Sequence, residues 1–106
     1  MELDSYALVL LHSGPRAHDF AEDEIVRLQE AHLGQLRSLR NTGKLVASGP
    51  ISDQPDESLR GLCLYACGIE DARRLAEGDP SVHAGRLAVG VMTWWTPKGS
   101  VSFHPA

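Results

Sequence analysis

The side chain with the clearest potential for chemistry is His32. It belongs to an apolar stripe at helical spacing, so its ring is expected to point into the protein. A buried imidazole needs a hydrogen-bond partner, and imidazole is the side chain best suited to moving a proton near neutral pH. Taken alone, the pattern favours a core histidine bonded to a backbone carbonyl over a functional one. The stripe consists of Ile25, Leu28, His32, Leu36 and Leu39.

A second candidate is Asp79, which is followed directly by Pro80. This pair favours a new helical turn, with aspartate as N-cap and proline as the first residue. A carboxylate has about four acceptor positions, so a capping aspartate can also bond to a histidine. Asp79 would then fix the tautomer and orientation of His32, and His32 would act as general base or acid. That chemistry needs no cofactor.

The remaining polar residues give weaker signals. His12, His18 and His83 fall near one end of the expected sheet, but their spacing matches no standard metal-ligand pattern, and we predict no metal site. Arg16 and Arg86 could each meet an anionic ligand, although exposed arginines usually contact only solvent.

The two cysteines are expected to be free thiols. Cys63 and Cys67 fall in one predicted strand, where four residues separate their Cα atoms by ~13 Å, beyond the ~7 Å that a disulfide spans. Free thiols suit a reducing compartment. The acidic N-terminus does not resemble a signal peptide, and we expect a cytoplasmic protein.

Length and charge narrow the class of protein. The chain has 106 residues and a formal net charge of −4, without a stripe of lysine or arginine. One domain is expected at this length, and a nucleic-acid partner is excluded because the basic footprint is missing. The longest apolar run, residues 6–11, is too short to span a bilayer, so no membrane partner is expected.

The order of predicted elements is β-α-β-β-α-β, which indicates a ferredoxin-like α+β fold. The first helix is expected to begin at Asp19, where Glu22 completes the spacing of a capping box, and to end at Gly43. The second helix should run from Gly68 to Gly78, with Ile69 on its inner face. The predicted strands are Tyr6–His12, Lys44–Ser48, Leu59–Cys67 and Leu87–Thr96.

Both faces of the predicted sheet are apolar, although helices cover only one face in this fold. A second copy of the same sheet is the simplest cover, because most soluble oligomers are symmetric homomers. We therefore expect a homodimer packed sheet to sheet. The domain should span residues 1–97, and the tail at 98–106 should be loosely held. The apolar sets are Tyr6, Leu8 and Leu10 against Ala7, Val9 and Leu11, and Val89, Val91 and Trp95 against Met92 and Trp94.

The chain also resembles a known family, the YCII-related (YciI-like) domains. The resemblance covers about residues 5–97. The chain departs from the usual pattern of the family in the loop after the first strand, in the Ser81-Val82-His83 turn and in the tail. The residues that carry it are, in order, Ala31-His32-Leu33, Gly43, Ala47-Ser48-Gly49-Pro50, Gly61, Asp71-Ala72 and Asp79-Pro80.

The resemblance implies a ferredoxin-like fold that pairs into a dimeric α+β barrel. It implies a His-Asp site, which maps onto His32 and Asp79, with Ser48, Gly49, Pro50 and Arg16 as candidate substrate-binding residues. Relatives include a dehydrochlorinase of a chlorinated hydroxyquinol, and muconolactone isomerase shares the barrel. The implied function is a cofactor-independent lyase or isomerase acting on a small anionic or cyclic substrate. The alternative is a non-catalytic, dimeric ligand-binding or accessory domain that keeps the pair for structure.

Overall fold

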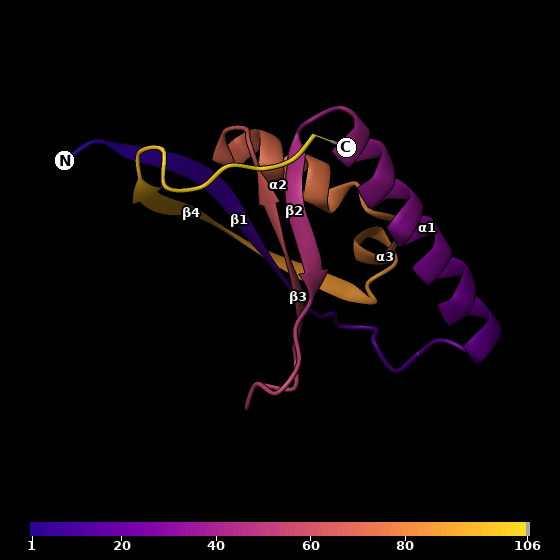
Figure 1. Cartoon of the computed structure of the whole chain (residues 1–106). Helices are drawn as coiled ribbons and strands as arrows, with labels where there is room; N and C mark the ends of the chain where they lie inside the picture. The colour runs from indigo at the N-terminus through magenta and orange to yellow at the C-terminus, as the bar shows by residue number, and fades with distance from the viewer. Residues whose placement is uncertain (106) are drawn as a thin grey trace.

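The four strands and two long helices expected from the sequence are all present in the computed structural model, which describes residues 1–105. The turn expected after Asp79 is a third, short helix. In chain order the elements are β1 (Leu3–Ser13), α1 (Glu22–Asn41), β2 (Leu45–Pro50), β3 (Leu59–Tyr65), α2 (Ile69–Glu77), α3 (Pro80–His83) and β4 (Leu87–Pro97) (Figure 1).

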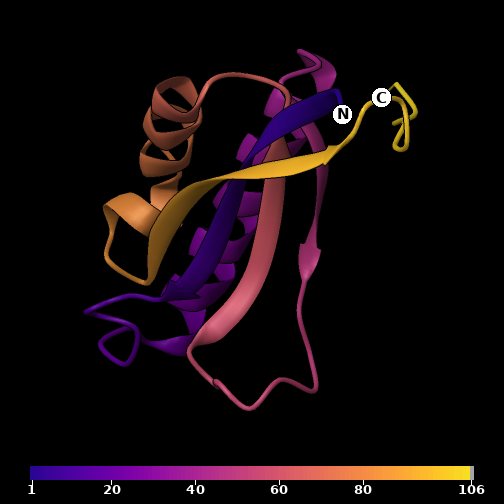
Figure 2. The same cartoon turned by 90° about the vertical axis from the view of Figure 1, so that its left-hand side faces the viewer.

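The sheet has the strand order β2-β3-β1-β4, and all three pairings are antiparallel. This is the ferredoxin-like arrangement, in which the two central strands come from opposite halves of the chain. In Figure 2, α1 passes behind the strands, while α2 and α3 lie beside β4. α1 contacts β2, and α2 contacts both β1 and β4, so the helices share one face of the sheet.

Alternation along the strands determines which apolar residues the helices bury, because successive side chains point to opposite faces. On β1 the buried set is Ala7, Val9 and Leu11, and across the sheet Val9 pairs with Cys63 of β3 and Val91 of β4. The members of the core cluster are Ala7, Val9, Leu11, Leu39, Leu45, Cys63, Tyr65, Ala72 and Ala76.

The opposite side of the sheet, called here the open face, is only partly covered. Tyr6, Leu8, Leu10 and Leu62 are half-buried, whereas Met92 and Trp94 remain exposed. The register places these residues together with Leu64 on one face, because Tyr6 pairs with Trp94, Leu8 with both Met92 and Leu64, and Leu10 with Leu62.

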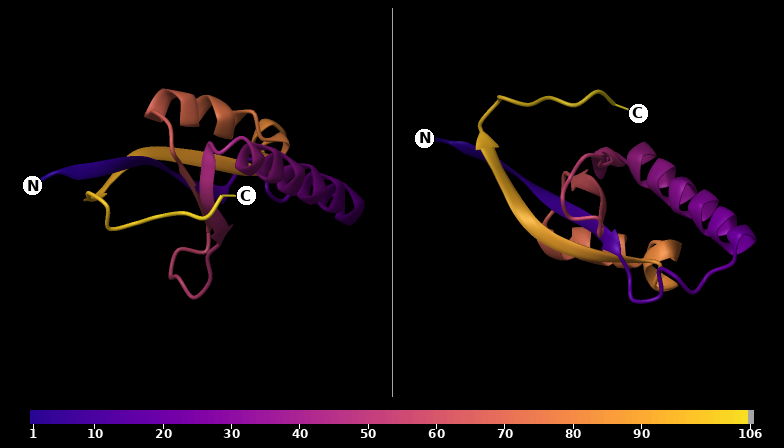
Figure 3. Two further views of the ribbon diagram at one scale, coloured as in Figure 1. Left: turned by 45° about the horizontal axis from the view of Figure 1, so that its top comes forward. Right: turned by 90° about the horizontal axis from the view of Figure 1, so that it is seen from below.

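The C-terminal tail is more ordered than expected. The ring of Phe103 meets the ring of Tyr6 edge-on, with centroids 5.3 Å apart, and the Gly99 N–H donates to Asp4 Oδ2 at 2.9 Å. Figure 3 shows the tail on the side of the sheet away from α2. The tail therefore packs on the open face as far as Phe103, and residue 106 lies outside the described residues.

Local sequence signals were correct at some helix ends and wrong at others. Gly43 ends α1 with φ of +82°, a left-handed conformation that glycine adopts without strain. The Asp19–Glu22 capping box is wrong. Ala21 is the N-cap instead, and its N–H donates to Glu24 at 3.1 Å. The first turn thus begins two residues later than predicted, with the same reciprocal spacing but without a side-chain cap at its first position.

Two predictions about the second half of the chain are also corrected. β3 ends at Tyr65, so Cys67 lies beyond it and not on the same strand face as Cys63. Both thiols are nonetheless free, as expected. Ile69 is exposed at the first residue of α2, because the first turn of the helix extends past the sheet, and Ala72 and Ala76 are the residues that face the core. Within residues 1–105 no helix has the length and apolar character needed to cross a bilayer.

Candidate active site

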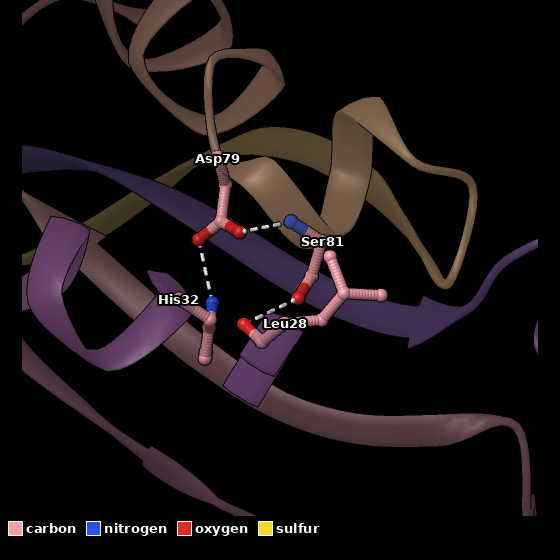
Figure 4. Close-up of polar contacts among 4 residues, drawn as sticks. All are labelled: Leu28, His32, Asp79 and Ser81. Carbon is pink, nitrogen blue, oxygen red and sulfur yellow. Dashed lines mark hydrogen bonds and ion pairs between the residues drawn. The ribbon is translucent and has the colours of Figure 1, made fainter. Parts of the chain in front are cut away.

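His32 and Asp79 form a direct hydrogen bond although 47 positions separate them in the chain. The His32 Nδ1 and Asp79 Oδ2 atoms lie 2.5 Å apart, and the two residues are 8% and 4% exposed (Figure 4). An ionised carboxylate only accepts, so Nδ1 carries the proton and donates it to Asp79. A short, buried contact between these groups is a charge-assisted hydrogen bond.

The second ring nitrogen of His32 is available for chemistry. Within residues 1–105 it has no hydrogen-bond partner, and no buried side-chain nitrogen or oxygen there lacks one. Nε2 must therefore reach a solvent-accessible surface even though the residue as a whole is buried. An imidazole held through Nδ1, with Nε2 free, has the arrangement of a general base.

Asp79 is held in place by the start of α3. α2 ends at Gly78, Asp79 adopts an extended N-cap conformation, and its Oδ1 accepts the Ser81 N–H at 2.8 Å. Pro80 suits the first helical position because its missing N–H would have no partner there. One carboxylate oxygen thus caps the helix while the other accepts the hydrogen bond from His32, so Asp79 makes both of the contacts expected of it.

Ser81 connects this turn to α1. Its side chain is fully buried, and its Oγ donates to the Leu28 carbonyl at 3.2 Å (Figure 4). Leu28 lies one helical turn before His32, so the bond fixes α3 against the same part of α1 that carries the imidazole. From the sequence, the Ser81 turn stands out only as a departure from the family pattern, because the neighbouring residues do not indicate that the Ser81 hydroxyl reaches another helix.

His32 lines a pocket of about 580 Å³ between α1, the sheet and the turn before β4. Ser48, Gly49 and Pro50, which β2 supplies, line the same pocket. A volume of this size is ordinary for a small-molecule site. Apolar side chains line much of it, namely Leu11, Leu33, Leu36 and Leu87, and Leu62 of β3 also borders the pocket, although its side chain faces the open face.

Arg16 is not among the residues that line this pocket. Its Nε lies 3.4 Å from Asp19 Oδ2, and its guanidinium lies 5.1 Å from the centre of the Phe20 ring, both within the loop after β1. Two other arginines, Arg60 and Arg86, line the pocket instead. Arg86 had been weighed from the sequence, whereas Arg60 had not, because a single arginine at the start of a strand carries no local signal.

Cys63 also borders the pocket, which no local pattern in the sequence indicated. Burial, and secondarily the negative charge of Asp79, raises the pKa of this thiol from near 9 to about 12. It is therefore a neutral thiol at physiological pH and not a thiolate nucleophile. Within residues 1–105 no group of three or more histidine, cysteine or acidic side chains is arranged to hold a metal ion.

Comparison with known proteins places the chain in a family. The model of the YCII-related domain matches residues 7–95. The chain belongs to the YCII-related domain family. The match spans β1 to β4 and includes both residues of the buried pair. No curated protein matches the chain.

The YCII-related domain also has a similar solved structure. It is the 5-chloro-2-hydroxyhydroquinone dehydrochlorinase of Burkholderia phenoliruptrix AC1100, in complex with 2,5-dihydroxybenzoquinone. The TM-score is 0.56 and the sequence identity 21%, and the alignment covers 89% of this chain and 95% of that one. At this identity the likeness shows a shared fold, which agrees with the ferredoxin-like sheet described above.

Proposed function

We propose that this YCII-related domain is a cofactor-independent enzyme of lyase or isomerase type that acts on a small cyclic or anionic molecule. The observation that supports it most directly is the His32–Asp79 bond of 2.5 Å, with the second nitrogen of the imidazole free and the residue on the wall of a pocket. A histidine kept only for core packing would have no reason to line a cavity of this size.

In the proposed mechanism His32 Nε2 takes a proton from the substrate. Asp79 keeps Nδ1 protonated, which leaves the Nε2 lone pair free, and its charge then stabilises the imidazolium that forms. In an elimination the leaving group departs as an anion while the proton stays on His32. In an isomerisation the same proton returns to a different atom of the substrate. General base catalysis of this kind contributes ~10²–10⁴-fold to a rate.

The similar dehydrochlorinase supports the elimination form of this chemistry. Removal of HCl from a chlorinated hydroxyhydroquinone needs a base for the proton and release of chloride, and no redox step. A planar ring would fit between the leucine side chains of the pocket, with Ser48 and Gly49 along one wall. We propose a small ring of this class as the substrate, and we assign the proton transfer to His32 alone.

We also propose that the protein acts as a homodimer, paired through the open face. Exposed Met92 and Trp94 beside half-buried Leu8 form an apolar surface that a second copy would cover. The helices, the dyad and the pocket lie on the other side of the sheet from this surface, so pairing would leave the site accessible.

The test uses 5-chloro-2-hydroxyhydroquinone and measures chloride release by the wild type and by His32→Gln. We expect release by the wild type and a loss of ~100-fold or more in the variant. Binding of 2,5-dihydroxybenzoquinone is measured in parallel by NMR titration. Binding by both proteins without chloride release from this or related ring substrates would contradict the enzyme and favour the alternative, a non-catalytic ligand-binding or accessory domain.

A further inference from the structure

The charged side chains on the pocket wall all have one sign. The chain has 14 acidic residues against 10 lysines and arginines, yet no aspartate or glutamate lines this pocket. Arg60 and Arg86 do. Asp79, the acid behind His32, is already bonded to His32 and Ser81. A concave site lined by positive side chains attracts anions and raises their local concentration, even in a protein whose net charge is negative.

Neither arginine forms an ion pair with a carboxylate of the described chain. Within residues 1–105, four ion pairs link an arginine or lysine to an acid, and Arg60 and Arg86 take part in none of them. Arg86 is half-buried, where an unpaired guanidinium is costly unless a ligand or water completes its hydrogen bonds. Glu57 lines a second cavity that shares Arg60 with the first.

The backbone holds the two arginines on opposite sides of β1. The Arg86 N–H donates to the Ser81 carbonyl at 3.0 Å, and its own carbonyl accepts the Gly14 N–H at 2.8 Å, so this residue is fixed by the same turn that holds Asp79. Arg60 lies at a β-bulge in the pairing of β1 with β3, where Leu11 pairs with Gly61 and His12 with Leu59. Bulges release a side chain from strict alternation and are frequent beside active sites.

We propose that Arg60 and Arg86 are the specificity-determining residues of this pocket and that its ligand is a small organic dianion. Each guanidinium binds one carboxylate or enolate group, and the apolar leucines between them contact the carbon skeleton. A guanidinium forks onto a delocalised oxyanion with two parallel hydrogen bonds, which selects carboxylates and enolates over neutral polar groups. The inference rests on the proposed use of this pocket as the substrate site, and it names what that site recognises.

The test uses probes that share a shape and differ in charge. Terephthalate, 4-carbamoylbenzoate and terephthalamide carry two, one and no negative charges on the same ring, and succinate, succinamate and succinamide do the same on a flexible chain. Affinities are measured by NMR titration of wild type, Arg60→Gln, Arg86→Gln and, as a control for net charge, Arg73→Gln, an exposed arginine on α2.

We expect the dianion to bind best in at least one series. Arg60→Gln and Arg86→Gln should each weaken dianion binding by ~10–100-fold, as expected for the loss of a hydrogen bond between charged groups, and Arg73→Gln should not. Equal binding of the diamide, equal effects of all three variants, or no binding of either dianion at millimolar concentration would overturn the inference.

His32→Gln separates this inference from the proposed function. If His32→Gln keeps the preference for dianions and the wild type releases no chloride, the dianion site is supported and the enzyme is contradicted. If chloride release depends on His32 but not on Arg60 or Arg86, the enzyme is supported and the dianion site is overturned.

Discussion

The helix-covered face and the open face of the sheet carry similar apolar side chains from the same strands, yet only one of them is closed. On β1, Val9 is fully buried, whereas its neighbours Leu8 and Leu10 on the other face stay half-exposed. The difference does not lie in residue type. It arises because α1, α2 and α3 all pack on one side, and only the short tail with Phe103 lies on the other.

The covered face is also where the polar groups are buried. His32, Asp79 and Ser81 lie under the helices, where His32 Nδ1, both carboxylate oxygens of Asp79 and the Ser81 hydroxyl each have a hydrogen-bond partner. Burial of such groups is tolerated only when each has a partner. The comparison thus separates a covered face, which holds the buried pair and the pocket, from an open face that stays partly exposed.

The largest effect is expected from Asp79→Asn on the covered face. Asparagine is as good an N-cap as aspartate, so α3 should keep its fold. An amide can also donate to Nδ1, so the His32 tautomer is no longer fixed, and we expect chloride release to fall by ~10²–10⁴-fold. Histidine ¹⁵N NMR reports the tautomer directly. The matched control is Asp71→Asn, an exposed acid on α2 whose partner is Arg74; equal activity in both variants would contradict the dyad.

A smaller effect is expected from Met92→Glu on the open face. If a second copy covers this face, the glutamate places an unpaired charge in the interface, and the dimer should dissociate ~100-fold more readily while the monomer stays folded. Sedimentation velocity over a concentration series measures this. Val26→Glu is the control, because Val26 is an equally apolar exposed residue on α1. A wild type that remains monomeric at micromolar concentration would exclude the proposed pairing.

The smallest effect concerns alkaline pH and Cys63, which faces the covered side of β3. Its folded pKa of about 12 lies above the unfolded value near 9. Stability from the buried neutral thiol is therefore complete below pH 9 and is lost as pH rises towards 12, at up to about 1.4 kcal/mol per pH unit.

Urea unfolding from pH 8 to pH 10 should show a flatter pH dependence in Cys63→Ala than in the wild type. Tyr65, whose pKa burial also raises, contributes equally to both proteins. Cys67→Ala is the comparison variant: burial also raises the pKa of this thiol, but it lies beyond the end of β3 and is only partly buried, so its removal should flatten the slope less. Identical slopes for Cys63→Ala and the wild type would contradict the buried neutral thiol.

Much of the fold follows from local patterns in the sequence. The apolar run at residues 6–11, the stripe that contains His32 and the glycines at positions 43 and 78 each act over a few residues, and they predicted the order of elements and the ferredoxin-like class. The Asp79-Pro80 pair predicted its own helix start for the same reason. Element ends were less certain. The start of α1 and the end of β3 shifted by two residues or more, because capping alternatives differ by little free energy.

The site itself was decided by tertiary structure. The sequence indicated that His32 points inward and that Asp79 caps a turn, but only the packing of α3 against α1 brings Nδ1 to 2.5 Å from the carboxylate. The placement of Arg60, Arg86 and Cys63 around one pocket depends on strand pairing between distant segments and on a bulge that no local pattern encodes. Capping and alternation act between near neighbours, whereas a pocket forms only when surfaces far apart in the chain meet.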